Sequence, residues 1–207
     1  MPDTVDNLIK ALMRLPGIGP RQAERFVFFL LQHPDTVRDI RQALDNLLSS
    51  VEQCSECFRY SPKKASRGEI CDICFSNKTE CSTLLVVEKD VDFANVHKSG
   101  IYKGLYFLLG GLVPILDKEP EKIIRARELV KRVEVLTKTG LKEVILALSA
   151  NPTGDHTLEY LREKLAPVLK KHNITLSVLG RGLSTGTEIE YSDSDTLSSA
   201  LSSRKTF

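Results

Sequence analysis

Four cysteines stand in two pairs with the spacing of a metal site. Cys54 and Cys57 form the first Cys-x2-Cys pair, and after thirteen intervening residues Cys71 and Cys74 form the second. Each pair places two thiolates in one tight turn, and two such turns complete a tetrahedral sulfur shell. Because protein atoms fill all four positions, the expected site is structural. The segment between the pairs, residues 58–70, is too short for a core of its own, so we expect metal to organise it.

Two alternatives to a zinc site exist for these cysteines. The thiols can pack simply as small hydrophobic side chains, and an iron–sulfur cluster also uses four cysteines. Since no feature of the sequence favours iron, we expect one structural Zn²⁺ per chain. The fifth cysteine, Cys81, lies just before an apolar segment, and we expect a buried thiol there rather than a further ligand.

Acidic residues follow two predicted strands in the second half of the chain. Glu88 and Asp92 come after the apolar segment 82–87, and Asp155 belongs to segment 151–156, which follows another apolar run. Ligands of open parallel sheets collect beyond the carboxyl ends of the strands, so these three carboxylates are predicted to converge. Oxygen ligands of this type suit Mg²⁺, which can bridge to phosphate.

The alternative for these acids is that they share no ligand. In that case Thr153 or Asp155 caps the N-terminus of a helix, and Glu88 and Asp92 are solvated. The sequence leaves both interpretations open.

A glycine-rich segment near the N-terminus separates two stretches of helical spacing. It reads Leu15-Pro16-Gly17-Ile18-Gly19-Pro20. Gly17 and Gly19 permit positive φ and place no side chain between the backbone and an approaching phosphate. Consecutive N–H groups can therefore point at phosphate oxygens beside a helix N-terminus, and such a site binds phosphates without reading bases.

Two arginines extend this predicted phosphate site. Arg21 and Arg25 are four residues apart on the following helix, hence on one face. The alternative is an αα-hairpin whose turn only reverses the chain and whose arginines are solvated. The complete string resembles helix-hairpin-helix DNA-binding motifs, which favours DNA. The predicted DNA-binding positions are Pro16, Gly17, Ile18, Gly19, Arg21 and Arg25.

Helical periodicity predicts the elements around the hairpin. It covers residues 5–13, a second helix that begins at Pro20, and about 35–51. The buried stripe of the second helix is predicted to contain Ala23, Phe26, Val27 and Leu30. The third helix is predicted to serve packing only, through Val37, Ile40, Leu44, Leu47 and Leu48.

The second half of the chain alternates short apolar runs with helical stripes. Strands are predicted at 82–87, 144–148 and 175–179, and helices at 123–133 and 158–169. This alternation implies a mostly parallel sheet flanked by helices. The most apolar run, 105–116, is too short to span a bilayer, which takes about 20 residues, and is interpreted as buried core.

The C-terminal part is rich in glycine and serine. Segment 180–186 lacks the lysine and the spacing of a phosphate-binding P-loop, so nucleotide binding is not inferred. Alternation predicts a strand over Glu188–Tyr191, and segment 192–207 is expected to end in a short helix and a frayed terminus.

Composition and charge set the remaining limits. A net charge of +2 and a pI of about 8.2 are only mildly basic, so a nucleic-acid site must come from local clustering. With 42% hydrophobic residues the chain can form an ordinary core. Segment 1–6 lacks the features of a secretory signal, and we expect a cytoplasmic protein without membrane attachment, where clustered thiols hold metal more often than they form disulfides.

Six strings in this order resemble the bacterial RecR family from near residue 5 to near residue 200. They are Leu-Pro-Gly-Ile-Gly-Pro-Arg, the two Cys-x2-Cys pairs, Val-Val-Glu, Leu-Gly-Gly-Leu, Asn-Pro-Thr, and Gly-Arg-Gly-Leu with Gly-Thr-Glu-Ile-Glu-Tyr. The resemblance implies an α/β fold with a helix-hairpin-helix region at 1–53, a four-cysteine zinc finger at 54–80, a Toprim domain at 81–179 and a C-terminal strand and helix segment at 180–207.

The resemblance also implies a function and partners. Members of the family act without catalysis as recombination mediators in DNA repair, and help load recombinase onto single-stranded or gapped DNA. The implied partners are DNA without sequence preference, the RecO and RecF proteins, and further copies of the chain in a ring-like homotetramer. The implied zinc ligands are Cys54, Cys57, Cys71 and Cys74, and the implied Toprim acids are Glu88, Asp92 and Asp155.

Two departures from the family pattern concern these sites. The loop between the cysteine pairs is longer than usual, which need not disturb the metal. Gly154-Asp155-His156 stands where the family commonly has a richer acidic stretch, which thins any metal shell at the sheet edge.

Two other functions compete with the DNA clamp. Toprim acids also serve metal-dependent phosphoryl-transfer enzymes, but nothing in the sequence places a tyrosine nucleophile beside the acids. A protein adaptor whose zinc module and α/β surface recruit partners would bind DNA only incidentally. A clamp predicts binding that tolerates any sequence and weakens with salt.

Overall fold

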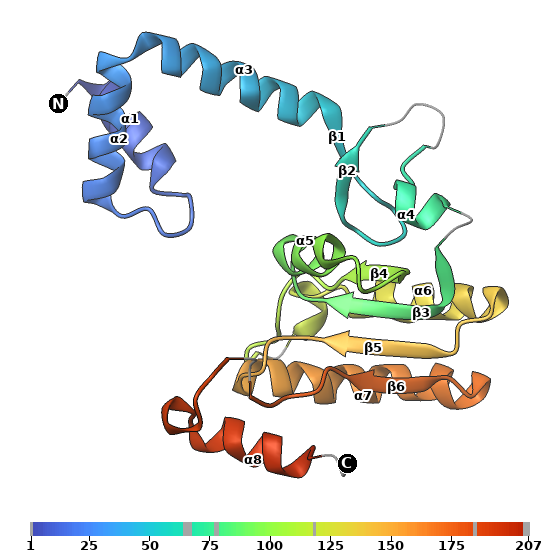
Figure 1. Ribbon diagram of the computed structural model, residues 1–207. Coiled ribbons are helices and arrows are strands. Elements are labelled where there is room, and N and C mark those ends of the chain that lie inside the picture. The colour runs from blue at the N-terminus through green and yellow to red at the C-terminus, as the bar shows by residue number, and fades with distance from the viewer. Residues whose placement is uncertain (1, 64–67, 77–78, 118, 184–185, 205–207) are drawn as a thin grey trace. The chain divides into compact units, whose positions relative to one another are not determined.

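The computed structural model shown in Figure 1 describes residues 2–63, 68–76, 79–117, 119–183 and 186–204. The chain divides into two compact units, residues 1–51 and 52–207. The first unit is helical, and the second contains the cysteine pairs and the sheet.

The N-terminal unit consists of three helices: α1 (Asp3–Leu12), α2 (Pro20–Gln32) and α3 (Pro34–Ser50). A proline occupies the first turn of both α2 and α3, where its missing N–H would have had no helical partner. Ile9, Ala23 and Val27 form the small core between α1 and α2. The predicted stripe of α2 is only partly correct, because Phe26 is exposed and Leu30 is half-buried.

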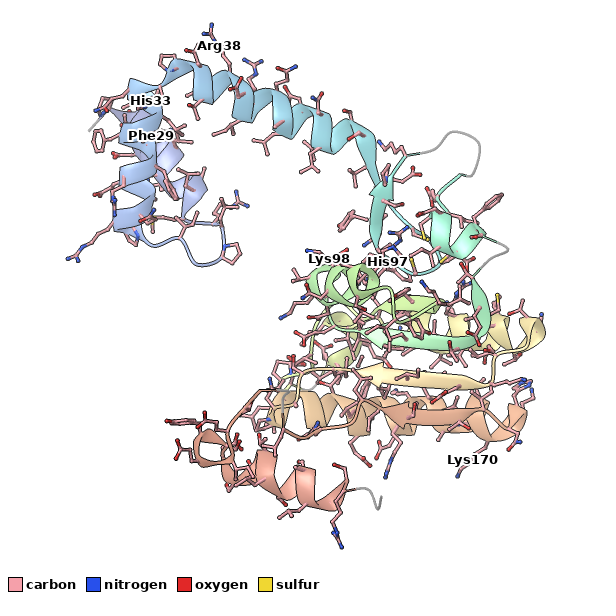
Figure 2. All side chains as sticks on the ribbon, in the orientation of Figure 1. Phe29, His33, Arg38, His97, Lys98 and Lys170 are labelled. Carbon is pink, nitrogen blue, oxygen red and sulfur yellow. The ribbon has the colours of Figure 1, made fainter. Side chains whose placement is uncertain are left out.

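The junction of α2 and α3 is held by a stacked ring pair. Figure 2 shows His33 beside Phe29, and their ring centroids lie 4.1 Å apart. A ring nitrogen of His33, Nδ1, lies 2.8 Å from the Phe29 carbonyl oxygen. The chain therefore turns from one helix into the next with no intervening loop beyond this histidine.

Helix α3 has the predicted bounds, but its apolar stripe is not buried. The five residues of that stripe are all exposed in the structure: Val37, Ile40, Leu44, Leu47 and Leu48. The prediction of a helix that only packs within the chain is therefore not supported, since this stripe lies at the surface.

The second unit begins with the module that carries the cysteines. Strands β1 (Val51–Gln53) and β2 (Tyr60–Pro62) form a two-stranded sheet, and the short helix α4 (Asp72–Phe75) follows. The basic positions at 64–67 lie outside the described residues.

A four-stranded parallel sheet forms the body of the second unit. Its strands are β3 (Glu80–Val87), β4 (Gly104–Leu108), β5 (Glu143–Ala147) and β6 (Thr175–Val178), in the order β4-β3-β5-β6. Val87 pairs with both Leu108 and Ala147, so three strands end at the same level. Their carboxyl ends consequently share one edge of the sheet, as Figure 1 shows for the arrows of β3 and β5.

Helices connect and cover the strands. They are α5 (Asp90–Ser99), α6 (Ala126–Leu136) and α7 (Pro152–His172), with one-turn 3-10 helices η1 (Pro120–Lys122) and η2 (Thr137–Thr139) beside α6. Alternation along β3 divides the core. Leu84 and Val86 pack with buried residues of α6 and α7, whereas Leu85 and Val87 pack with Phe93 of α5. The predicted α/β class with a parallel sheet and flanking helices is confirmed.

Segment 99–116 departs from the sequence analysis in two ways. Strand β4, like the preceding helix α5, was not predicted, although every residue of β4 is buried. The run predicted as buried core ends earlier than expected, since Ile115 and Leu116 are exposed after Pro114. No helix in the described ranges combines the length and apolarity needed to cross a bilayer.

The C-terminal segment contains a helix but not the predicted strand. Glu188–Tyr191 was predicted as a strand, and the structure instead has the 3-10 helix η3 (Ile189–Tyr191) followed by α8 (Ser194–Ser202). Ile189 and Tyr191 are both exposed, so the alternation of that segment faces no core. Without a sheet neighbour, alternation alone does not produce a strand.

Candidate metal centre and nucleic-acid interface

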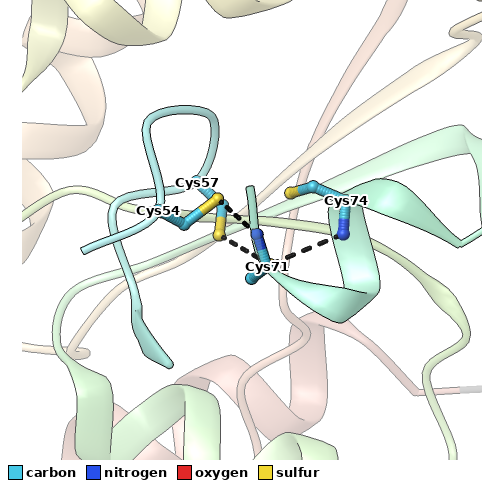
Figure 3. A group of neighbouring side chains, drawn as sticks. All are labelled: Cys54, Cys57, Cys71 and Cys74. Atoms are coloured by element: carbon cyan, nitrogen blue, oxygen red, sulfur yellow. Dashed lines mark hydrogen bonds between the residues drawn. The ribbon is translucent and has the colours of Figure 1, made fainter. Parts of the chain in front are cut away.

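The four paired cysteines converge in the second unit. One ligand atom from each of Cys54, Cys57, Cys71 and Cys74 lies within 4.8 Å of the others (Figure 3). Three of the four residues are buried and Cys74 is half-buried. Four sulfur atoms at this spacing can occupy the corners of one tetrahedral site, so the chain has the ligands for a metal ion.

Local hydrogen bonds shape both cysteine turns. The Phe58 amide donates to the Cys54 carbonyl oxygen at 2.9 Å, which closes the first turn. In the second, Cys71 caps α4 and its sulfur accepts from the Cys74 amide at 3.5 Å. The turns meet where the Cys71 amide donates to the Cys54 sulfur at 3.3 Å. Amide hydrogen bonds to sulfur favour the thiolate form that metal binding needs.

Phe58 joins this module to the sheet. Its backbone has a φ of 63°, a left-handed conformation that favours glycine, and its ring lies edge-on to Phe107 with centroids 5.5 Å apart. The guanidinium of Arg125 also lies over the Phe58 ring, 5.1 Å from its centroid. Nearby, the Leu108 amide of β4 donates to the Cys57 carbonyl oxygen at 2.9 Å. The first cysteine turn is thus hydrogen-bonded to an outer strand of the sheet.

Cys81 lies apart from this group. Its thiol is half-buried and donates to the Thr79 carbonyl oxygen at a distance of 3.6 Å. It packs beside the main core rather than with the other sulfur atoms.

Glu88 stands at the carboxyl end of β3, and its side chain is almost fully buried. One oxygen pairs with the Lys89 ammonium at 2.7 Å, and the other accepts from the Ser149 hydroxyl at 2.6 Å. Burial by itself would raise the pKa of Glu88, but these partners outweigh it and hold the pKa below its ordinary value.

Asp92 and Asp155 have different partners. Asp92 accepts from the Lys89 amide at 3.0 Å at the start of α5, and Asp155 pairs with Arg181. Arg181 holds the pKa of Asp155 below its ordinary value. Within the described ranges, the cysteines are the one group of at least three such side chains close enough to share an ion. Glu88, Asp92 and Asp155 thus follow the same sheet edge without forming such a group.

The N-terminus of α7 supports this edge. Its cap is Asn151, whose side chain accepts from the Gly154 amide at 2.8 Å, rather than Thr153 or Asp155 as considered from the sequence. Any Cβ on Gly154 would overlap the Ser149 carbonyl oxygen, so only glycine lets the helix approach this closely. The close approach places Ser149 beside Glu88.

The predicted DNA-binding hairpin lies in the N-terminal unit between α1 and α2. Gly17 has a φ of 80°, and Ile18 turns inward to pack against the small core. Pro16, Gly17 and Gly19 are exposed. Gly19 is the N-cap of α2 and offers no side chain to cap it. Pro20 has no N–H, and the Gln22 amide donates to the Gly19 carbonyl oxygen at 3.1 Å, so of the first-turn amides only that of Arg21 forms no hydrogen bond within the described part of the chain.

Arg21 and Arg25 lie on the first two turns of α2. Both are exposed, and within the described part of the chain neither forms an ion pair. They therefore remain available to an anionic partner beside the start of α2.

Three neighbours of these sites were missed by the sequence analysis. Ser149 and Arg181 bind acids from positions 61 and 26 residues away, and Arg132 pairs with Glu56 between the first two cysteines. Arg181 sits between two glycines, which is a local signal of a functional arginine. Ser149 and Arg132 carry no such signal, because only the tertiary fold brings them to their partners.

Together these features define the class. The molecule combines a helix-hairpin-helix unit, a four-cysteine cluster and a parallel sheet of the Toprim type. Three family models match parts of the chain: "RecR, helix-hairpin-helix" matches residues 5–48, "Toprim domain" matches 82–180, and "RecR, C-terminal" matches 182–205.

Relatives cover almost the full length of the chain. "Recombination protein RecR" of Roseiflexus sp. (strain RS-1) is 35% identical over 206 residues, 99% of this chain and 95% of the relative. The protein of the same description from Lactobacillus acidophilus is 34% identical over 206 residues, 99% of this chain and 98% of the relative. The chain belongs to the RecR family.

Proposed function

We propose that this protein is a recombination mediator in DNA repair, which binds DNA as a non-catalytic, sequence-nonspecific clamp. The observation that carries the proposal is the hairpin with exposed Pro16, Gly17 and Gly19, followed by Arg21 and Arg25, which form no ion pair within the described ranges. Backbone amides and arginines of this kind bind phosphates without reading bases. The relatives named as recombination proteins support the same role.

Self-association into a ring-like tetramer forms part of this proposal. The exposed apolar stripe of α3, in the same unit as the hairpin, supports it, because a run of exposed large apolar side chains along one helix marks an interaction surface. A closed ring would hold DNA topologically, so each hairpin could contribute only modest phosphate contacts. We propose the RecO and RecF proteins as partners on family membership alone, and a cytoplasmic location on the same basis.

We propose a structural Zn²⁺ held by Cys54, Cys57, Cys71 and Cys74. The donor set fits this ion, because four thiolates form the closed tetrahedral shell of structural zinc sites. When bound, the ion supplies a cross-link between the two cysteine turns. The chain supplies the orientation of those turns through the amide hydrogen bonds to Cys54 and Cys71.

The arrangement at the sheet edge supports a non-catalytic role. Glu88 is ion-paired to Lys89 and Asp155 to Arg181, and Asp92 accepts a hydrogen bond from a backbone amide. Burial raises the pKa of Tyr102 and of Tyr106, which disfavours the phenolate form that a tyrosine nucleophile would use. Mg²⁺ at these acids stays a prediction that would require Lys89 and Arg181 to give way.

Mass in solution with circular and linear DNA tests the clamp. We expect a stable complex with closed circles that survives raised salt, and loss of the complex after the circle is cut, since a ring slides from free ends. Equal retention on both forms would contradict encirclement. Reproducible Mg²⁺-dependent nicking that Glu88→Gln abolishes would contradict the non-catalytic assignment.

A further inference from the structure

Each cysteine pair encloses an acid that is ion-paired to a buried arginine. Glu56 lies inside the first pair and binds Arg132 of α6, and Asp72 lies inside the second pair and binds Arg59. The arginine side chains are only 11% and 10% exposed, whereas Glu56 and Asp72 are 33% and 55% exposed. One such ion pair, between an acid inside the cysteine pair and a buried arginine, therefore occurs at each half of the metal centre.

Arg59 makes three contacts that hold it in place. Its carbonyl oxygen accepts from the Cys54 amide at 2.9 Å, so its backbone belongs to the first cysteine turn. Its guanidinium reaches across to Asp72 in the second turn and lies 5.1 Å from the centroid of the Phe93 ring of α5. This one side chain thus joins both cysteine turns to the α/β body.

Arg132 approaches the first cysteine turn from the α/β body. It lies on α6, beside Val133, which is fully buried in the main core. A small cavity of about 210 Å³ borders Arg132, Glu56 and Phe58. Because α6 is anchored by the core, the ion pair fixes the position of Glu56, and with it the turn between Cys54 and Cys57.

Burying two guanidinium groups costs desolvation free energy unless nearby negative charge compensates it. Within the described part of the chain, Nε of Arg59 and Nε of Arg132 are both buried without a hydrogen-bond partner. Four thiolates around one Zn²⁺ carry a net charge of −2, which is itself unfavourable in a buried site. The partner carboxylates are more exposed than the arginines, so solvent screens their charge more strongly.

We propose that Arg59 and Arg132 are positioning residues of the metal centre, which hold the two cysteine pairs at ligand spacing and place positive charge beside the metal–thiolate unit. The inference rests on the proposed metal site and assigns the residues that surround its cysteine ligands. Outer-shell partners orient the ligands of metal sites, and their loss typically lowers metal affinity by about 10 to 100-fold.

Metal competition tests this role. The full chain is titrated with Zn²⁺ against a chromophoric chelator, and with Co²⁺, whose visible absorption reports a tetrahedral sulfur shell. For Arg59→Met and Arg132→Met we expect affinity about 10 to 100-fold below that of the parent, with the tetrahedral Co²⁺ spectrum retained at saturation. Arg127→Met is the matched control, because Arg127 is an exposed arginine of the same helix, ion-paired to Glu121.

The outcomes separate this inference from the zinc proposal. If the parent binds neither ion, the metal site itself is wrong. If the parent binds and both variants match Arg127→Met, the arginines have no positioning role. Should Arg132→Met fail to fold, Glu56→Gln decides, since it leaves the arginine in place and breaks only the pair: a tenfold or greater loss of affinity supports the inference, and a smaller loss overturns it.

Discussion

The Ser149 hydroxyl donates a 2.6 Å hydrogen bond to Oε2 of Glu88, joining the ends of two neighbouring parallel strands across 61 positions of sequence. Lys89 pairs with the other oxygen of the same carboxylate. The carboxylate is nearly inaccessible to solvent, so its partners decide its charge. Glu88, buried and bonded through both oxygens, therefore stabilises the sheet edge in this structure.

Glu88 makes stability depend on acid pH. Its pKa in the folded protein lies below the ordinary value of 4.5, so its stabilising contribution is fully present above that value and is lost as the pH falls through the lowered pKa. Urea unfolding of the parent should therefore show stability declining on acidification, and Glu88→Gln should flatten that decline. An unchanged pH dependence in the variant would contradict this assignment.

Gly154 permits the approach of α7 to the sheet edge. Gly154→Ala places a methyl group against the Ser149 carbonyl oxygen and should destabilise the fold by about 1 to 3 kcal/mol, as overpacking does. Thermal unfolding followed by circular dichroism measures the loss. Gly180→Ala is the control, because a Cβ there meets no atom within 4 Å. Equal unfolding temperatures for the two variants would show that α7 adjusts freely.

The two arginines of α2 set the salt dependence of DNA binding. Arg21→Ala with Arg25→Ala should weaken binding to all sequences alike and reduce the log–log salt slope by about 0.9 per lost phosphate contact on duplex DNA. Fluorescence anisotropy over a salt series measures both effects. Arg38→Ala is the control within the same unit, since Arg38 is ion-paired to Asp35. Unchanged affinity of the double variant at low salt would remove the proposed role.

Metal removal should unfold the cysteine module. Protein purified without added zinc is expected to contain about one zinc per chain, and Cys71→Ser should lower both the zinc content and the unfolding temperature, because the closed shell contributes directly to folding. Cys81→Ser should retain the metal, since its thiol lies outside the group. Metal analysis by mass spectrometry distinguishes them, and full zinc content in Cys71→Ser would contradict the ligand set.

The stripe on α3 should govern self-association. Leu44→Glu with Leu48→Glu places charges on exposed apolar positions and is expected to shift the mass in solution toward smaller species while helix content is kept. Light scattering coupled to size exclusion measures the mass. Leu116→Glu is the control, as that residue is 92% exposed in the other unit. An identical mass distribution would place the interface elsewhere.

Strong local patterns predicted most of the fold. Three strands of the sheet, β3, β5 and β6, and helices α1, α2, α3, α6 and α7 overlap the ranges that periodicity predicted for them, because their apolar residues recur at the period of the element. Helix α5 escaped prediction because Phe93 is its only fully buried residue, Val96 is half-buried and Val91 is exposed, so no full apolar stripe marks the helix. The sequence of α5 therefore showed neither a helical apolar period nor a buried stripe that would have predicted it.

The candidate sites were predicted to the extent that their residues are close in sequence. Paired cysteines and the Pro-Gly hairpin are local patterns, and the structure gathers the four sulfur atoms as expected. Whether the hairpin and the acids bind ligands stays a prediction. Arg59, Arg132 and Ser149 could not be found, because their partners Asp72, Glu56 and Glu88 lie far away in the sequence and only the tertiary fold brings them together. Phe58 was hidden for another reason: its left-handed backbone is one that sequence patterns assign to glycine.

The hydrogen bond from Leu108 to Cys57 has a bearing on solubility. Strand β4 lies at the margin of the sheet, where free amides readily recruit a strand from another molecule. The cysteine turn occupies the amide of Leu108, the last residue of β4, and so covers the end of this margin. If loss of the metal loosens this turn, the Leu108 amide becomes free at the sheet edge, and the protein should then aggregate more readily.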